Sequence, residues 1–140
     1  YNISSLLNND EYWTLARSIW TDSENIWQLI PIIHDALTAN ERLSSRSLMM
    51  TAEERKFLNE LPDEITVYRG AGKENRKGYS WTIDKEMAKW FATRLRKVGE
   101  LLTGRIQKSN IIAYISGRNE DEIIAIPSDV KIVASIQIQG

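Results

Sequence analysis

The sequence predicts an α+β fold in which helices come first and a mainly antiparallel β region follows. Up to about residue 62 the apolar residues recur at helical spacing, and beyond it short β-branched and aromatic runs take over. With 140 residues, of which 42% are hydrophobic, the chain is long enough for one domain with its own core. We therefore expect a single domain over residues 1–140, with a helical part at 1–62 and a β-rich part at 63–140.

Two stretches near the N-terminus carry the helical pattern. In residues 10–20 the apolar side chains lie three and four positions apart. Residues 23–37 repeat this pattern, and Pro31 in their interior predicts a kink or two shorter helices. Tryptophans recur seven residues apart along this part, and they belong either in the core or, if exposed, in a binding patch. These tryptophans are Trp13, Trp20 and Trp27.

A third helix is predicted at residues 51–61. Thr51 can cap its N-terminus while Glu54, three residues later, reaches back to the backbone of Thr51, which is the spacing of a capping box. Pro62 then ends the helix, because proline has no amide hydrogen to donate.

Beyond Pro62 the runs of β-branched and aromatic residues predict short strands. A polar loop bounded by glycines, residues 71–78, separates the first two. The predicted strands are residues 65–70, 79–82, 110–115, 122–126 and 130–138. Their short connections favour antiparallel pairing.

One helix is expected within the β region, over residues 85–98, with Asp84 as its N-cap. Met87, Phe91 and Leu95 form a stripe four residues apart, which predicts that this face packs on the core. Trp90, beside the stripe, can line a pocket or pack.

Composition excludes several kinds of site. The chain has no cysteine, so disulfides, thiolate zinc sites and a cysteine nucleophile are excluded, and a reducing compartment such as the cytoplasm of a bacterial or host cell is expected. The single histidine, His34, argues against a histidine-based metal site or a Ser-His-Asp triad, so we expect no metal. The net charge is −1 and no apolar run approaches the ~18 residues of a membrane span, so neither nucleic acid nor a membrane is expected as a partner.

Polar residues stand at the ends of three of the predicted strands. Arg69 ends the first, Ser80 and Thr82 lie in the second, and Glu120 and Glu122 lead into the fourth. Taken singly, each has the character of a solvated strand residue. Strand ends at a sheet edge also hold side chains rigidly around a cleft, and two glutamates on one face repel each other unless a cation or a function offsets the repulsion. Their combination therefore indicates a site.

The order of these residues resembles the Arg-Ser-Glu class of mono-ADP-ribosyltransferases, of bacterial-toxin and bacteriophage type. That family combines an aromatic-Arg motif, a Ser-Thr-Ser type motif and a Gln/Glu-x-Glu motif, which correspond here to Tyr68–Gly70, Ser80–Thr82 and Glu120–Glu122. The resemblance covers residues 65–138, about half of the chain. It departs from the family at Trp81, which we expect in the core. It implies an antiparallel β core of two sheets that binds NAD.

The resemblance also implies roles for these residues. The bond between nicotinamide and ribose in NAD breaks through an oxocarbenium-like transition state, which the carboxylate of Glu122 would stabilise. Ser80 would hydrogen-bond Glu122 and hold its rotamer, and Arg69 would bind the pyrophosphate. The residues expected to contact NAD are Tyr68, Arg69, Gly70, Ser80 and Thr82.

Glu120 concerns the acceptor of ADP-ribose. In the family, a glutamate two residues before the catalytic one accompanies arginine acceptors, so the resemblance implies an arginine of a bacterial or host target protein. Tyr114 and Asn119 precede it and would touch the acceptor, although Tyr114 can equally be a core strand residue. Asp121 is expected to be a solvated spacer. A NAD glycohydrolase and an inactive binding module with the same fold remain open alternatives.

Overall fold

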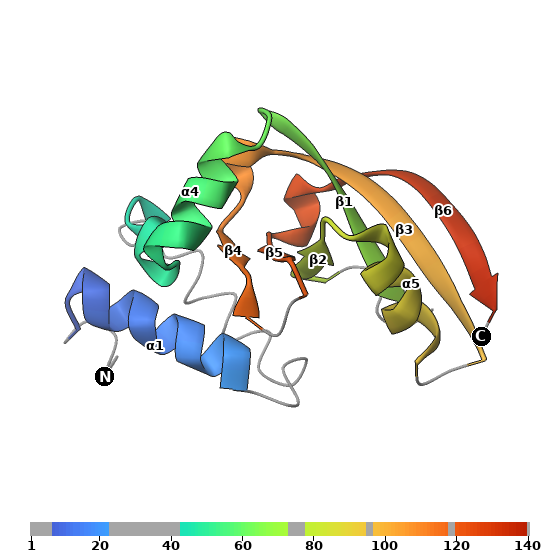
Figure 1. The fold of residues 1–140 in the computed structure, drawn as a ribbon, viewed down its shortest axis with the longest axis horizontal. Coiled ribbons are helices and arrows are strands. Elements are labelled where there is room, and N and C mark those ends of the chain that lie inside the picture. The colour runs from blue at the N-terminus through green and yellow to red at the C-terminus, as the bar shows by residue number, and fades with distance from the viewer. Residues whose placement is uncertain (1–6, 23–42, 73–77, 95–96, 118–119, 140) are drawn as a thin grey trace.

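The computed structural model has an α+β fold, as the sequence predicts (Figure 1). It describes residues 7–22, 43–72, 78–94, 97–117 and 120–139. Within these ranges the α-helices are α1 (Asn9–Asp22), α4 (Ala52–Glu60) and α5 (Lys85–Thr93). None of the described helices is long and apolar enough to cross a membrane. The helix predicted at residues 23–37, which includes Trp27, Pro31 and His34, lies outside the described residues.

In the described part of the chain, all strands belong to one antiparallel sheet, in the order β4-β5-β2-β1-β3-β6. The strands are β1 (Glu64–Ala71), β2 (Ser80–Thr82), β3 (Val98–Gln107), β4 (Ala113–Ile115), β5 (Glu122–Ile124) and β6 (Lys131–Gln139). The prediction of two sheets is therefore wrong. A single registered pair, Tyr68 with Thr82, joins the short strands β4, β5 and β2 to the long strands β1, β3 and β6. Figure 1 shows the long strands curving over α5, while α4 lies near β4.

The strand β3 is absent from the sequence-based prediction, although it is the longest in the sheet. Gly99 and Gly104 interrupt its apolar run. Glycine and the charged residues of this segment lower its strand propensity. Its pairing with β1 along its length and with β6 on its other side decides its conformation. The glycines are needed for close packing: a Cβ at residue 99 would lie 1.9 Å from the carbonyl oxygen of Ala92, and one at residue 104 would lie 2.5 Å from Val130.

Both predicted helix caps are present. The hydroxyl of Thr51 accepts from the amide of Glu54 at 3.2 Å, and the carboxylate of Glu54 accepts from the amide of Thr51 at 2.8 Å, which confirms the capping box. The carboxylate of Asp84 accepts from the amides of Glu86 and Met87 at the start of α5. Local sequence alone therefore sets where these two helices begin.

The face by which α5 packs differs from the prediction. Ala88 and Ala92 are fully buried, whereas Met87 and Phe91 of the predicted stripe are only half-buried. A Cβ at Gly70 of β1 would lie 2.0 Å from the carbonyl oxygen of Ala88. The helix backbone thus lies directly on the sheet, which is possible only where small residues face each other, and the larger side chains are displaced to its flanks.

The tryptophans of α1 belong to the core. Trp13 is fully buried and Trp20 is 3% exposed, so for these two residues the core alternative is confirmed and the binding patch is not. The indole nitrogen of Trp13 donates to the hydroxyl of Ser45 at 3.0 Å. This packing places α1 beside the turn that precedes α4.

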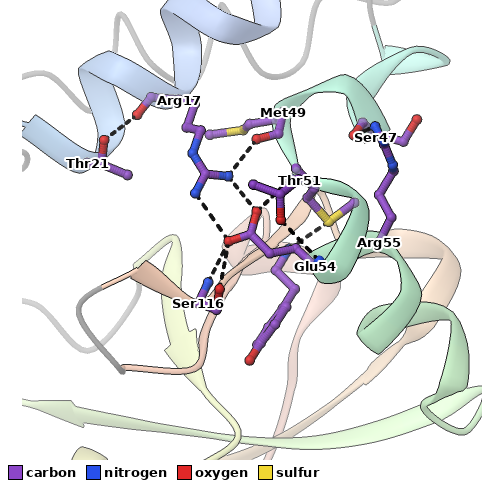
Figure 2. A network of polar contacts seen from close by, with 10 residues as sticks. Arg17, Thr21, Ser47, Met49, Thr51, Glu54, Arg55 and Ser116 are labelled. Carbon is purple, nitrogen blue, oxygen red and sulfur yellow. Dashed lines mark hydrogen bonds and ion pairs between the residues drawn. The ribbon is translucent and has the colours of Figure 1, made fainter.

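Glu54 connects α1, α4 and the end of β4 (Figure 2). Its buried carboxylate accepts from the guanidinium of Arg17 at 2.5 and 3.2 Å and from the amide and hydroxyl of Ser116 at 2.8 and 3.1 Å. Burial acts to raise the pKa of Glu54, but the hydrogen bonds from Arg17, Ser116 and Thr51 outweigh it and lower that pKa to about 2. The carboxylate is therefore ionised and fully hydrogen-bonded in the folded protein.

Candidate functional site

Seven of the nine residues that the sequence assigns to the site line one pocket of about 210 Å³. They are Tyr68, Arg69, Gly70, Ser80, Thr82, Glu120 and Glu122. The sheet order explains why they meet, because β5, β2 and β1 are neighbours, so three motifs far apart in the sequence are adjacent in space. The pocket is smaller than the about 300–1,000 Å³ usual for small-molecule sites, so it can enclose only part of a dinucleotide.

Glu122 begins β5 and is buried, with 7% of its surface exposed. It pairs with Thr82 on one side and with Ile115 on the other, so its backbone is held within the sheet. The hydroxyl of Ser80 donates to Oε2 of Glu122 at 2.5 Å. This is the contact that the resemblance implies, and it sets the orientation of a largely buried carboxylate that lines the pocket.

Arg69, near the end of β1, is held against the start of β2. Its Nη1 donates to the carbonyl oxygen of Ser80 at 2.8 Å. The guanidinium also lies over Gly78, where a Cβ would be 2.3 Å from Cζ and from Nη2. Glycine at residue 78 thus leaves the space that the guanidinium occupies, and Arg69 presents a positive charge at the pocket wall.

Thr82 and Gly70 line the pocket, but both also have structural contacts that the sequence does not reveal. The hydroxyl of Thr82 donates to the carbonyl oxygen of Glu120 at 2.8 Å and accepts from the amide of Asp84 at 3.0 Å. It therefore holds the backbone beside Glu120 rather than extending to a ligand. Gly70 is required by its contact with α5, described above. Trp81 is buried, as expected, and donates to the carbonyl oxygen of Gly78.

Phe91 of helix α5 and Arg94, directly after the helix, line the pocket, and the sequence analysis assigned neither to the site. The predicted core position of Phe91 is wrong, because the helix packs through its alanines and Phe91 faces the pocket half-buried. The guanidinium of Arg94 lies 5.6 Å from the ring centre of Phe91 and 5.2 Å from that of Trp90, which is 55% exposed. The sequence did contain a signal for both pocket residues. Phe91 and Arg94 are three positions apart in the helix predicted after Ser80–Thr82, and this spacing places both side chains on one helix face.

Of the two residues expected to touch the acceptor, the structure describes Tyr114, which does not line the pocket. Tyr114 lies in β4, is 4% exposed and stacks on Phe57 of α4, which favours its core alternative. Its hydroxyl donates to Oδ1 of Asp121 at 2.6 Å. The expectation that Asp121 is a solvated spacer is therefore wrong, because it is half-buried and hydrogen-bonded. Asn119 lies outside the described residues.

A larger cavity, of about 510 Å³, lies away from this site beside α4 and the end of β3. Its basic residues are occupied by main-chain carbonyls: Arg46 donates to the carbonyl oxygens of residues 43, 109 and 111, and Lys108 to those of residues 59 and 61. These cations therefore connect segments of the protein.

The described residues contain no group of three or more histidine, cysteine, aspartate or glutamate side chains placed to hold a metal ion. No protein-family model, no curated protein and no solved structure matches the chain.

Proposed function

We propose that the chain is a NAD-dependent mono-ADP-ribosyltransferase that modifies an arginine side chain of a target protein and releases nicotinamide. One observation carries the proposal: a buried carboxylate, Glu122, is oriented by Ser80 in a pocket that Arg69 also lines. These three groups come from three strands, and together they suit a substrate that develops positive charge next to a diphosphate.

Glu122 would act on the ribose of NAD. When the bond between the anomeric carbon and nicotinamide breaks, its electron pair leaves on the nicotinamide nitrogen and positive charge develops on the ribose. A carboxylate that is already oriented and largely shielded from water stabilises that charge more strongly than one in bulk solvent. Nicotinamide leaves as a neutral molecule, so the reaction requires no general acid.

Arg69 and Arg94 would provide the charge that the diphosphate of NAD requires. Guanidinium groups bind phosphate oxygens through paired N–H donors. The aromatic ring of Phe91, which also lines the pocket, offers a flat apolar surface for the nicotinamide ring. A pocket of about 210 Å³ suits the nicotinamide end of NAD, with the remainder extending over the surface.

Glu120 would act on the acceptor. It lines the same pocket, two residues from Glu122, and is only partly buried, so a guanidinium from solvent can reach it. A carboxylate at that place can orient the guanidinium and take the proton that it loses as its nitrogen bonds to the anomeric carbon. Without an acceptor, water takes that place, and the same pocket acts as a NAD glycohydrolase.

The test is to incubate the protein with labelled NAD and a bacterial lysate, and to follow free nicotinamide and labelled protein together. Glu122→Gln keeps size and hydrogen bonding but removes the charge, so both signals should fall at least about a hundredfold. Glu120→Gln should keep nicotinamide release and lose most of the protein labelling. Equal turnover in wild type and Glu122→Gln would refute the proposal. Binding of NAD without turnover in wild type would instead favour an inactive module of the same fold.

A further inference from the structure

We infer that Tyr114 and Asp121 form a brace that sets the position of Glu120, and that this brace decides how much ADP-ribose reaches a guanidinium acceptor rather than water. The inference rests on the proposed function and concerns two residues outside the pocket lining. Both are positioning residues, since they act on the substrate through Glu120.

The first observation is the backbone of Asp121. Among the residues that the structure describes, it is the one non-glycine residue with a positive φ, 46°. Aspartate tolerates this left-handed region better than most residues, but the conformation persists only where the surroundings hold it. Because Asp121 lies between Glu120 and Glu122, its φ determines how the chain enters β5 and where Glu120 is placed relative to Glu122.

The second observation is that this conformation is held by named contacts. The hydroxyl of Tyr114 donates to Oδ1 of Asp121 at 2.6 Å, and the amide of Ile83 donates to the carbonyl oxygen of Asp121 at 3.3 Å. The carbonyl oxygen of Glu120 accepts from the hydroxyl of Thr82 at 2.8 Å. The last two bonds hold the backbone to the end of β2 and to the residue after it, and the first holds the side chain of Asp121.

The third observation is that the donor itself is rigid. Tyr114 pairs with Ile123 across β4 and β5, and its ring stacks on Phe57 of α4 with centroids 4.5 Å apart and planes at 21°. Burial and the hydrogen bond to Asp121 raise the pKa of Tyr114 well above its ordinary value, so its hydroxyl remains a donor throughout the working pH range.

Helix α4, which packs on Tyr114 through Phe57, also contacts the chain directly after β4, at the other end of the segment that leads from β4 to β5. Glu54 of α4 accepts from the amide and hydroxyl of Ser116, directly after β4 (Figure 2). Ser116 and Asp121, on either side of residues 117–120, are thus both tied through contacts that lead to α4. The helical part of the chain would therefore serve the reaction by supporting the segment from which Glu120 reaches the acceptor.

The test measures how ADP-ribose is divided between water and a small guanidinium compound, agmatine, in wild type and variants. Tyr114→Phe removes one hydroxyl and keeps the ring stacked on Phe57. Nicotinamide release without agmatine should stay within about twofold of wild type, because Glu122 and Ser80 are unchanged. Transfer to agmatine should fall about tenfold, because a small displacement of a positioning group has a large effect on rate.

Two substitutions at residue 121 separate the hydrogen bond from the backbone conformation. Asp121→Asn keeps an oxygen acceptor and tolerates positive φ, so it should divide ADP-ribose as wild type does. Asp121→Gly adopts positive φ without strain but has no side chain, so it should behave like Tyr114→Phe. The melting temperature of each variant shows whether it is folded at the assay temperature.

The outcomes distinguish this inference from the proposed function. Wild-type release of nicotinamide with an unchanged division in Tyr114→Phe and in Asp121→Gly would overturn the brace and leave the proposed function standing. Equal losses of nicotinamide release and transfer in a folded Tyr114→Phe would also overturn it, because the effect would then not act through the acceptor. No nicotinamide release by wild type would overturn both.

Discussion

Ser80 contributes to the pocket through two different atoms. Its hydroxyl donates to Glu122, and its carbonyl oxygen accepts from Arg69. The two groups that the proposed reaction requires, a carboxylate at the ribose and a guanidinium at the diphosphate, are therefore positioned by one residue of β2. Replacing the side chain disturbs the first contact and leaves the second in place.

We predict that Ser80→Ala lowers kcat for nicotinamide release about tenfold while KM for NAD changes less than about twofold. A hydrogen bond to a charged group contributes about 1.5–3 kcal/mol, and its loss lets the carboxylate leave its oriented rotamer. Arg69 keeps its partner on the main chain, so binding of NAD should persist. Steady-state kinetics of wild type and Ser80→Ala measure both constants. A rise in KM with unchanged kcat would contradict the orienting role of the hydroxyl.

A second prediction concerns Gly78. A Cβ at this residue would lie 2.3 Å from the guanidinium of Arg69, which is the end of a flexible side chain and can move away. Gly78→Ala should therefore raise KM for NAD at least about fivefold with a change in unfolding free energy below about 1 kcal/mol. Gly117→Ala is the matched control, because the nearest atom to its Cβ is 4.0 Å away. Equal KM values for the two variants would refute the placement of Arg69 at the diphosphate.

At the scale of elements, α5 shows how contact between small residues positions a functional helix. Ala88 and Ala92 lie against Gly70 and Gly99, so the helix backbone touches β1 and β3 directly. This close approach brings Phe91, and Arg94 after the helix, to the pocket. The distance between helix and sheet is thus part of the geometry of the site.

We predict that Gly99→Ala destabilises the protein by about 2 kcal/mol. Its Cβ would lie 1.9 Å from the carbonyl oxygen of Ala92, and since that atom belongs to the backbone, the whole helix must shift. Lys89→Ala, on the same helix, removes only an exposed pair with Glu86 and should change stability by less than about 0.5 kcal/mol. Urea denaturation of both variants measures the difference. A neutral Gly99→Ala would show that the helix does not rest on β3.

The elements also show which features a sequence can predict. The capping box at Thr51 and Glu54 is predicted correctly because its two residues are only three positions apart. The strand β3 is missed because its glycines are explained only by the chain segments that pack on them. The stripe through Phe91 misleads for a related reason: a row of large residues ordinarily marks the buried face, whereas here the alanines beside it are buried.

For the whole molecule, the order of the three motifs along the chain predicts which residues meet, but not how many sheets carry them. One registered pair, Tyr68 with Thr82, makes a single sheet of what the resemblance implied as two, and no local pattern specifies such a pair. The bond from Tyr114 to Asp121 also cannot be predicted from the sequence, because it depends on how β4 lies beside the start of β5.

Glu54 determines how the stability of the whole chain should depend on pH. Its pKa is lowered from 4.5 to about 2 in the folded protein. A group whose folded pKa is depressed stabilises the fold above its unfolded pKa, and that stabilisation is lost as pH falls from about 4.5 toward 2. The shift corresponds to about 3 kcal/mol, which is a large part of the stability of a small domain.

We therefore predict that Glu54→Gln lowers the free energy of unfolding by about 3 kcal/mol at about pH 7, and that the deficit narrows as pH falls below about 4.5. Glu53→Gln, its exposed neighbour on α4, should change stability by less than about 0.5 kcal/mol. Urea denaturation at about pH 7 and at a pH below about 4.5 measures how far each of the two variants differs from wild type in free energy of unfolding. If residues 1–140 form one domain, wild type unfolds in a single transition by tryptophan fluorescence and circular dichroism alike, because Glu54 connects the helices to the sheet. A deficit that stayed constant with pH would show that the charge of Glu54 does not provide this connection.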